Sequence, residues 1–407
     1  MGDRLLDPRA AAEAVIERAP GPRPEAVSLD DALGRVLAAD VESRDDVPGF
    51  DNSAMDGFAV RAADTAAAMP AEPALLTLVG ESRAGRPYDG TIQPGQAVVI
   101  STGAMLPRGA DAVLRIEDAD QRGMELRASS PLPPGKEVRR AGEDLRGGQT
   151  ALTAGIRLGP AELGVAASVG VAELPCAIQP RVAVVVTGDE LVEPPAPLGP
   201  GQIRNTNGHA MRAQAAEAGA VVERVMHVGD DRPATVDALR RALDADVVIA
   251  TGGVSVGPHD HVRPAMAELG VEQVFSGVAL RPGKPTWFGV AHRPAGLVLV
   301  FGLPGNPVSA MVTFHLFARP ALACMLGTSP RERRSVATMD VDYRKPPGRA
   351  HVVRCKLETR DDGWHVSPTK AQGSHVLTSM LNVGALVYLE VERGDVNAGE
   401  RVEIEIL

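Results

Sequence analysis

Residues 181–188, RVAVVVTG, form a continuous apolar run that ends at a glycine. Strands of parallel sheets are buried on both faces, so their sequences are unbroken hydrophobic runs and do not alternate. Two similar runs follow, DVVIATGG at 246–253 and LVLVFGLPG at 297–305, and helix-like segments separate them. This alternation of strand and helix predicts a doubly wound α/β domain over 179–330.

Helical patterns lie upstream of this domain. Residues 7–19 predict an amphipathic helix that starts at Asp7 with a proline in its first position, and 28–39 predict another helix. Residues 160–169 predict a third helix, which we expect to lie beside the first two. The sequence therefore predicts an N-terminal helical region assembled from separated segments.

The remaining parts of the chain are typical of β structure. Short alternating segments separated by Gly and Pro occupy about 70–140, and the chain ends in the alternating RVEIEIL. We expect the first group to form a β-rich region and the second a small C-terminal β-barrel or sandwich.

Composition restricts the class of protein. The net charge of the 407 residues is −10, which argues against binding nucleic acid through its phosphates. Cys176, Cys324 and Cys355 are dispersed, which favours reduced thiols and a cytoplasmic location. The N-terminus lacks the apolar core of a signal peptide, and we expect no apolar run to approach the roughly 20 residues of a membrane span.

Unusual loops follow each of the three buried strands. They are TGDE at 187–190, TGGVSVG at 251–257 and GLPGNP at 302–307. Ligands of open α/β sheets bind at the carboxyl ends of the strands, so these loops are expected to converge on one site. The glycines of TGGVSVG would let backbone N–H groups cradle an anion, although a tight strand-to-helix turn explains that loop alone equally well.

Carboxylates gather at the same strand ends: Asp189, Glu190, Asp230, Asp231 and Asp260. They would repel a phosphorylated ligand unless they hold Mg²⁺, which prefers oxygen ligands and bridges to phosphate. One of them would also serve as a general base on water. Helix capping explains one member of the 230–231 pair, because a helix is expected to start there.

Two short loops carry basic residues. Prolines flank Arg281 and Lys284 in RPGKP, and they would fix the directions of two cations suited to phosphate oxygens. Arg139 and Arg140 precede Glu143 and Asp144 in a similar loop, where a solvated turn is the simpler explanation.

Together these motifs resemble one family, the molybdopterin molybdenumtransferases (the MoeA family, to which the E domain of gephyrin is similar). The motifs occur in the same order over nearly the whole chain. They are PGFDNSAMDGFAV (48–60), RRAGED (139–144), VTGDEL (186–191), TGGVSVGPHD (251–260), RPGKP (281–285), GLPGNPVSA (302–310) and QGSH (372–375).

This resemblance implies an elongated homodimer with four structural regions in each subunit, the second inserted into the first. The expected domains are 1–45 with 145–178 (helical), 46–144 (inserted β), 179–330 (α/β) and 331–407 (C-terminal barrel). The active site would lie between the α/β domain of one subunit and N-terminal parts of the other. The implied reaction takes adenylylated molybdopterin and molybdate, releases AMP with the help of Mg²⁺, and leaves molybdenum on the dithiolene. The implied protein partners are a molybdopterin adenylyltransferase and maturation proteins of molybdoenzymes.

The resemblance also implies roles for individual residues. Arg281 stands where the family usually has Lys. A planar guanidinium group therefore replaces a compact ammonium group at this position. The implied catalytic residues are Glu190, Asp231, Asp260, Lys284, Asp56 and Asp144, the first three as metal ligands; the implied substrate-binding residues are Thr187, Gly188, Asp189, Gly252, Gly253, Ser255, Arg281, Pro304, Pro307, Arg140, Arg349 and Ser374.

The loop 47–60, VPGFDNSAMDGFAV, is expected to complete this site across the dimer. Phe50 and Phe58 would anchor it in a core, so that its polar residues are held in place. Asp56 is the residue we most expect to contact the substrate, whereas Asp51 suits a turn cap equally well. As implied by the resemblance, Asp56, Arg140 and Asp144 would enter from the partner subunit.

Two other functions have to be weighed. A molybdopterin adenylyltransferase would share a similar α/β domain, but it is a single small domain without the other motifs. A binding protein with a degenerate site would not need Glu190, Asp260 and Lys284, which are retained here together with Asp231. We therefore expect an active molybdenumtransferase.

Overall fold

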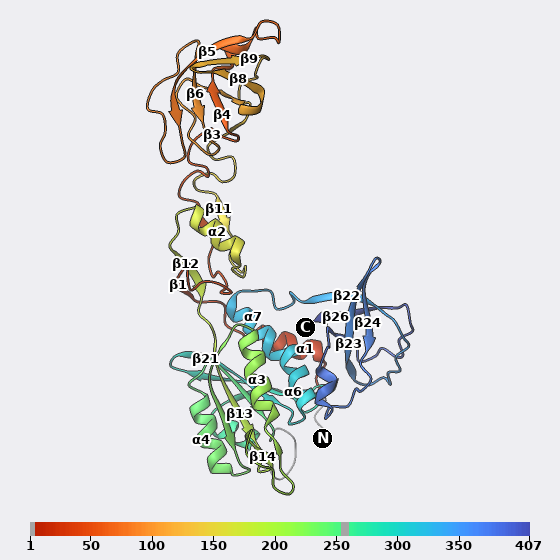
Figure 1. The fold of residues 1–407 in the computed structure, drawn as a ribbon. Coiled ribbons are helices and arrows are strands. Elements are labelled where there is room, and N and C mark those ends of the chain that lie inside the picture. Colours follow the sequence, from red (N-terminus) through yellow and green to blue (C-terminus); the bar gives the residue numbers. More distant parts are fainter. Residues whose placement is uncertain (1–4, 254–259) are drawn as a thin grey trace.

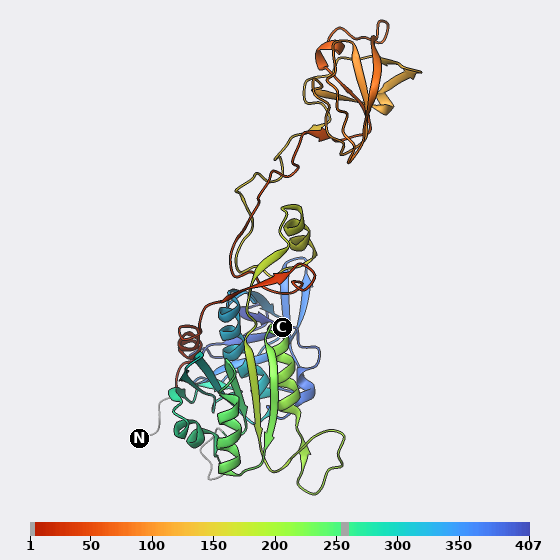
Figure 2. The same cartoon turned by 90° about the vertical axis from the view of Figure 1, so that its left-hand side faces the viewer.

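The computed structural model describes residues 5–253 and 260–407. The molecule is elongated, with a β domain at one end, a narrow connecting region, and an α/β domain beside a β-barrel at the other end (Figures 1 and 2). The β domain, the α/β domain and the C-terminal barrel expected from the sequence are present in the expected order along the chain, whereas the expected N-terminal helical region is not formed by the described residues.

The α/β domain is built on a mixed sheet. In the described part of the chain, the strand order of this sheet is β16 (Val221–Val228), β13 (Arg181–Thr187), β17 (Val247–Thr251), β21 (Gly296–Leu303), β20 (Trp287–Arg293) and β18 (Glu272–Ser276). The first four strands are parallel, as predicted. The last two add antiparallel pairings at one edge.

Helices cover both faces of this sheet. One face carries α3 (Thr206–Glu217), α6 (Pro307–Thr313) and α7 (Arg319–Leu326), and the other carries α4 (Arg232–Ala242) and α5 (Val262–Glu268). Within β13, Val184 packs with the first group, whereas Val185 packs with the second. Burial on both faces explains why this strand has an unbroken apolar sequence.

A single long helix runs beneath the sheet. It comprises α6, a π-helical segment η3 (Phe314–Ala318) and α7. Its 20 residues are long and apolar enough to cross a membrane by length and composition, so the expectation that no such run exists is wrong. However, 72% of an apolar 18-residue window within it is buried inside the protein. Its apolar character is therefore that of a core helix.

The first helix, α1 (Pro8–Ile16), forms as predicted, but in a different place. Asp7 caps it, accepting hydrogen bonds from the N–H groups of Arg9 and Ala10. Its buried face joins the core of the α/β domain and contacts α7, not the helix at 160–169. The expected bundle of N-terminal helices is therefore wrong, because α1 finds its apolar partner in another domain.

The helix predicted at 28–39 is also wrong. Residues Pro24–Ser28 form strand β1, which pairs with β12 (Glu173–Ala177). The N–H groups of Gly34 and Leu37 donate to the carbonyl oxygens of Leu158 and Ile156, so backbone partners come from distant segments. These bonds replace the bonds to residue i−4 that a helix needs. The helix α2 (Pro160–Ser168) is confirmed and packs on this connecting region.

The inserted β domain contains the predicted short strands. Its chain enters and leaves at one point, where the Val47 N–H donates to the Leu145 carbonyl oxygen at 2.7 Å. In the described residues, its main sheet has the order β7 (Ala112–Arg115), β4 (Gly57–Val60), β6 (Gln96–Ile100), β5 (Ala74–Ser82), β9 (Glu125–Ala128) and β8 (Ala119–Arg122). A shorter pair in this domain is β3 (Asn52–Ser53) with β10 (Val138–Arg139), whereas β2 (Val41–Glu42) pairs with β11 (Thr150–Leu152) in the connecting region.

The C-terminal domain is a closed barrel. Among the described strands, the ring runs β23 (Ala350–Arg360), β24 (Gly363–Pro368), β22 (Arg334–Met339), β26 (Arg401–Ile406), β25 (Ala385–Leu389) and back to β23. A strand of the α/β domain, β19 (Leu280–Arg281), adds to β23 from outside. The other short elements are β14 (Leu191–Val192), β15 (Ile203–Arg204), η1 (Ala62–Thr65), η2 (Ile116–Asp118) and η4 (Leu377–Met380).

Candidate functional site

A cleft of about 840 Å³ opens where the parallel strands end. The chain leaves β13 toward β16 on one side and returns to β17 on the other, so this edge is the topological switch point of the sheet. All three loops predicted from the sequence line the cleft. Their lining residues are Thr187, Gly188 and Glu190, then Gly252, Gly253 and Asp260, then Pro304, Gly305, Asn306 and Pro307.

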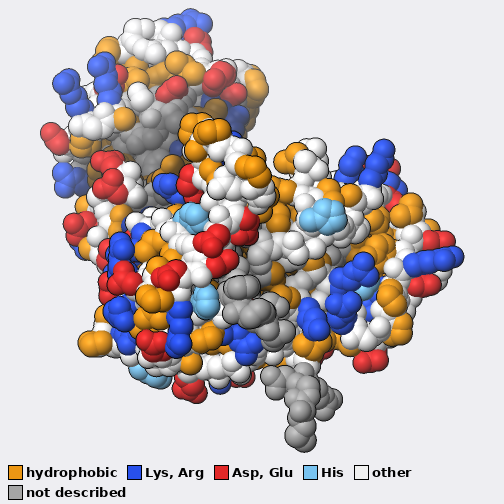
Figure 3. All heavy atoms as spheres, turned by 90° about the horizontal axis from the view of Figure 1, so that it is seen from below, with side chains coloured by type: hydrophobic (Ala, Val, Ile, Leu, Met, Phe, Trp, Pro, Cys, Tyr) orange, Lys and Arg blue, Asp and Glu red, His pale blue; other side chains and the backbone are white. Residues whose placement is uncertain are grey.

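The charges on this face are unevenly distributed. Figure 3 looks onto the molecule from below, at the edge where the strands end. Acidic and histidine side chains lie near the middle of the face, and basic side chains lie on both sides of them, including the side toward the barrel. The face therefore offers both cation-binding and anion-binding groups.

The second loop requires glycine. Gly252 has a φ of +82°, and a Cβ there would lie 2.6 Å from the carbonyl oxygen of Thr187. Gly253 has a φ of +59°, and its Cβ would lie 2.9 Å from Val262. The close approach of β13 thus explains Gly252, and the packing of α5 against the loop explains Gly253. Ser255, the other residue expected in this loop, lies outside the described residues.

The carboxylates divide between the cleft and structural roles. Glu190, Asp230 and Asp260 line the cleft. Asp231 instead caps α4, because its carboxylate accepts the Ala234 N–H at 2.8 Å. Asp189 accepts the N–H of Asp230 at 2.9 Å and so ties the two loops together. Of the two neighbours at 230–231, the structure places Asp230 in the cleft, whereas the family resemblance implied Asp231.

Asn207, at the start of α3, is a cleft residue that the sequence analysis missed. Its Nδ2 donates to the Gly305 carbonyl oxygen at 2.8 Å, whereas its buried Oδ1 has no hydrogen-bond partner in the described part of the chain. The buried hydroxyls of Thr187 and Thr251 are likewise unpartnered among these residues. Unpaired buried polar atoms are uncommon, and they are expected where a ligand binds. The polar run RNTN after a strand was the available signal.

The predicted basic loop lies between the cleft and the barrel. Pro285 lines the cleft, and Lys284 before it is exposed. Arg281 is exposed on β19, opposite His351 of the barrel. Burial, and then the charges of Arg281, Lys345 and Arg349, lower the pKa of His351 to about 4. The imidazole is therefore neutral at pH 7, and the positive charge of this region resides on Lys and Arg side chains.

The barrel contributes its QGSH loop to the cleft. His375 and Leu377 are lining residues, and the Ser374 carbonyl oxygen accepts the Val308 N–H of α6 at 3.3 Å. Ser374 itself is half-buried beside them. Arg349 is exposed just before β23 and does not line the cleft in the described part of the chain. Two structural domains thus build one site.

The predicted loop of the β domain has its polar groups occupied locally. The Asp56 carboxylate accepts the N–H of Thr102 at 2.7 Å and its hydroxyl at 3.0 Å, and these bonds lower the pKa of Asp56. Asp51 accepts the Ala141 N–H at 2.9 Å and pairs with Arg140. Asp144 is exposed.

The two phenylalanines of this loop differ. Phe58 is 2% exposed and anchors the loop, whereas Phe50 is 43% exposed, so the expectation of two buried anchors is wrong for Phe50. Phe58 belongs to β4 and faces the sheet core, whereas Phe50 precedes β3 in a bend outside the sheet. Within one subunit, this loop lies at the opposite end of the molecule from the cleft (Figure 1).

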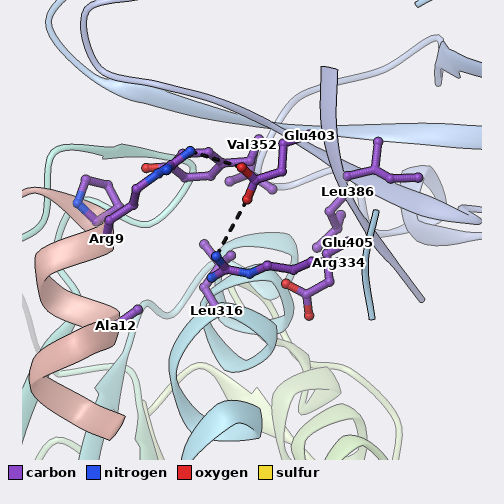
Figure 4. A pocket seen from close by; sticks show the side chains of 11 residues that line it. Arg9, Ala12, Leu316, Arg334, Val352, Leu386, Glu403 and Glu405 are labelled. Atoms are coloured by element: carbon purple, nitrogen blue, oxygen red, sulfur yellow. Dashed lines mark hydrogen bonds and ion pairs between the residues drawn. The ribbon is translucent and has the colours of Figure 1, made fainter. Parts of the chain in front are cut away.

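A second hollow separates α1 and η3 from the barrel (Figure 4). Its volume is about 30 Å³, which suits one or two water molecules. Arg9 reaches across it to the carboxylate of Glu403 at 3.0 Å. We therefore assign this hollow to the packing between domains and not to a substrate.

Family models match the chain in three consecutive parts. The MoeA N-terminal region (domain I and II) matches residues 6–170, and a probable molybdopterin binding domain matches 183–323. The MoeA C-terminal region (domain IV) matches 336–407. The three parts correspond to the N-terminal half, the α/β domain and the barrel described above.

Relatives match over nearly the full length. Molybdopterin molybdenumtransferase 2 of Mycobacterium tuberculosis is 38% identical over 393 residues, covering 94% of this chain and 95% of that protein. Molybdopterin molybdenumtransferase of Haemophilus influenzae is 37% identical over 399 residues, covering 96% of each. A solved structure of the molybdopterin biosynthesis MoeA protein of Pyrococcus horikoshii has a TM-score of 0.85 at 33% identity and covers 99% of both chains. This chain belongs to the MoeA family of molybdopterin molybdenumtransferases, which act in molybdenum cofactor biosynthesis.

Proposed function

We propose that this protein takes adenylylated molybdopterin and molybdate, cleaves the phosphoanhydride with release of AMP, and leaves molybdenum on the dithiolene of the pterin. The observation that carries this proposal is the cleft at the switch point. There, carboxylates from three strand ends lie opposite the basic RPGKP loop and the barrel. A site of this kind suits a substrate that has both a phosphoanhydride and a bound oxyanion. The reaction would occur in the cytoplasm.

The donors in the cleft fit Mg²⁺. Glu190, Asp230 and Asp260 offer only oxygen ligands, which Mg²⁺ prefers. Among the described residues, no three His, Cys, Asp or Glu side chains lie close enough to surround a metal by themselves. The proposed Mg²⁺ would therefore need water and substrate phosphate to complete its coordination, as Mg²⁺ commonly does. When bound, the ion would offset charge on the phosphoanhydride.

The residues of the chain bind and orient the substrate. Lys284 and Arg281 would hold molybdate or phosphate oxygens, with Arg349 and Ser374 approaching from the barrel. Because the substrate already contains the activated phosphoanhydride bond, the protein would act mainly by orienting the substrate and by stabilising the negative charge that develops as the bond breaks. The pocket for the pterin nucleotide would be formed by Thr187, Gly188, Gly252, Gly253, Pro304 and Pro307, with Asp189 holding the loop at 230 in place.

We also propose a homodimer in which the β-domain loop of one subunit approaches the cleft of the other. Strands β3 and β4 of the β domain lie at the opposite end of the subunit from the ends of the parallel strands (Figure 1), so Asp56, Arg140 and Asp144 would act in trans. A two-fold arrangement would use each loop and each cleft once. The expected protein partners are the adenylyltransferase that supplies the substrate and the maturation proteins that receive the product.

AMP release tests this function. Purified protein, Mg²⁺, molybdate and adenylylated molybdopterin are mixed, and AMP is measured by chromatography. We expect AMP release that needs both molybdate and protein. Consumption of ATP with unadenylylated molybdopterin would indicate an adenylyltransferase instead. A protein that binds adenylylated molybdopterin without releasing AMP would be a binding protein, and the enzymatic proposal would be wrong.

A further inference from the structure

Arg354 is a fully buried cation in the wall of the barrel. It lies in β23, and its Nη2 donates to the carbonyl oxygens of Ala371 at 3.1 Å and Gly373 at 3.3 Å. Its Nε and Nη1 are buried and have no hydrogen-bond partner among the described residues. Among the described residues, the groups that shift the pKa of Arg354 do not include a carboxylate. Hydrogen bonds to two carbonyl oxygens are therefore the interactions that offset the free-energy cost of burying this guanidinium.

Such an arrangement is costly for stability. Burial lowers the pKa of Arg354, because the surrounding protein disfavours the charged form. Buried ionic groups are often replaced by apolar side chains of similar volume without loss of stability. An unbranched apolar residue would fill the same space, so stability alone does not account for an arginine here. The positions of the two carbonyl groups it binds offer a different reason.

Those carbonyl groups belong to a loop that Gln372 also fastens to β23. The Gln372 Oε1 accepts the N–H of Arg354 at 3.1 Å, and its Nε2 donates to the carbonyl oxygen of Arg354 at 2.9 Å. The same Nε2 donates to the carbonyl oxygen of Thr369 at 3.1 Å. Residues 369–373 are thus held on both sides by the backbone and side chain of one strand residue.

The loop continues directly into the cleft. Ser374 follows Gly373, and its carbonyl oxygen accepts the Val308 N–H at the first turn of α6. His375 and Leu377 then line the cleft, and η4 packs against α6. The anchor on Arg354 and the wall of the cleft are therefore separated by only a few residues of chain.

We propose that Arg354 is a positioning residue that fixes the loop 371–377 at the mouth of the cleft, so that Ser374 and His375 meet the substrate in a set geometry. This proposal rests on the proposed molybdenum transfer for its effect on catalysis, but the loop geometry is independent of it. A lysine would keep the charge but lacks the rigid planar group that orients both carbonyl groups. The conservative substitution is therefore not expected to restore full function.

The test compares Arg354→Met with Arg360→Met. Arg360 lies on the same strand but is exposed and paired with Asp340, so it controls for the loss of an arginine from β23. Hydrogen exchange is followed at the amides of 371–377, and KM and kcat are measured for AMP release. For Arg354→Met we expect an unchanged or higher melting temperature, at least tenfold faster exchange in 371–377, and a KM increase of about tenfold with kcat changed less than threefold. Arg354→Lys should fall between the wild type and Arg354→Met.

Unchanged exchange at 371–377 in Arg354→Met would overturn the proposal. So would a lower melting temperature with faster exchange throughout the barrel, since that pattern describes a merely structural residue. If Arg354→Met does not fold, Gln372→Leu releases the same loop without removing the buried cation, and unchanged exchange in that variant would overturn the proposal equally. A wild type that releases no AMP would contradict the proposed function, while the exchange measurement would still decide the role of Arg354.

Discussion

The α/β cleft and the β-domain loop at 50–56 contain the same kinds of residue, yet they use them differently. The loop satisfies its own polar groups: Asp56 binds Thr102, and the Ser53 hydroxyl donates to the Met55 carbonyl oxygen. The cleft leaves buried acceptors such as Asn207 Oδ1 unpaired among the described residues. Polar residues in a turn therefore do not by themselves identify a binding site. The structure must also show whether their hydrogen bonds are made to neighbouring residues or are left for a ligand.

The largest expected effect comes from the cleft carboxylates. Glu190→Gln and Asp260→Asn should each reduce kcat/KM for AMP release by about 100-fold or more, because each removes a charge that would hold the metal at the phosphoanhydride. AMP release is measured at saturating Mg²⁺. Asp244→Asn is the matched control, because Asp244 is an exposed carboxylate at the opposite edge of the sheet. Full activity in Glu190→Gln would show that this carboxylate has no role in the cleft.

The second expected effect links the two regions. Asp56→Asn should lose most of its activity alone, because this carboxylate would reach the cleft of the partner subunit. If inactive Asp56→Asn and inactive Glu190→Gln proteins are mixed and allowed to exchange subunits, about a quarter of wild-type activity should return, since half of the dimers are mixed and each mixed dimer has one intact site. Activity is measured after unfolding and refolding the mixture. No recovery despite proven subunit exchange would contradict a shared site.

A smaller effect is expected at Asn207. Asn207→Ala leaves the carbonyl oxygen of Gly305 without its donor, so the GLPGNP loop should lose its fixed position. We expect KM to rise about tenfold and the free energy of unfolding to fall by about 1–2 kcal/mol. Steady-state kinetics and urea denaturation measure the two effects. Asn207→Asp is the companion variant: a loss of the same size would show that the amide nitrogen, and not side-chain volume, is what the loop needs.

The smallest effect is expected at Asp51 of the β domain. The bond from Ala141 N–H, and then the Arg140 side chain, lower the pKa of its carboxyl below the ordinary 3.8. Stabilisation by a lowered pKa is present above the unfolded-state value and is lost as pH falls through the folded-state value. The side chain is 35% exposed, so Asp51→Asn should cost only about 0.5 kcal/mol at pH 7 and nothing near pH 2. Urea denaturation at both pH values tests this, and an equal cost at both would contradict the electrostatic explanation.

Much of the α/β domain follows from the sequence for a simple reason. Strands buried on both faces must be apolar throughout, so β13, β17 and β21 stand out, and the switch point then places their loops together. The barrel and β domain follow from alternation and turns. The segment 28–39 does not, because its helical periodicity was outweighed by backbone bonds to residues far away in the sequence.

The candidate site, like the fold, could be predicted from the sequence only where it depends on local patterns. The loops with Glu190 and Asp260 were found because each follows a buried strand. The choice between Asp230 and Asp231 depended on which carboxylate caps α4, and that depends on the direction of the chain after β16. Asn207 was missed because it acts through one bond to Gly305, a partner 98 residues away.

The bond between Val47 and Leu145 has a consequence for how this protein is assembled. The two ends of the β domain are held together at this bond. For the folding of the rest of the chain, the domain is therefore equivalent to a long loop whose ends are close together. Loop-closure entropy grows only slowly with length, so a long insertion at such a point adds little cost to folding the remainder. The β domain can therefore be folded, exchanged or lost as a unit, while the cleft it is proposed to serve is built entirely without it.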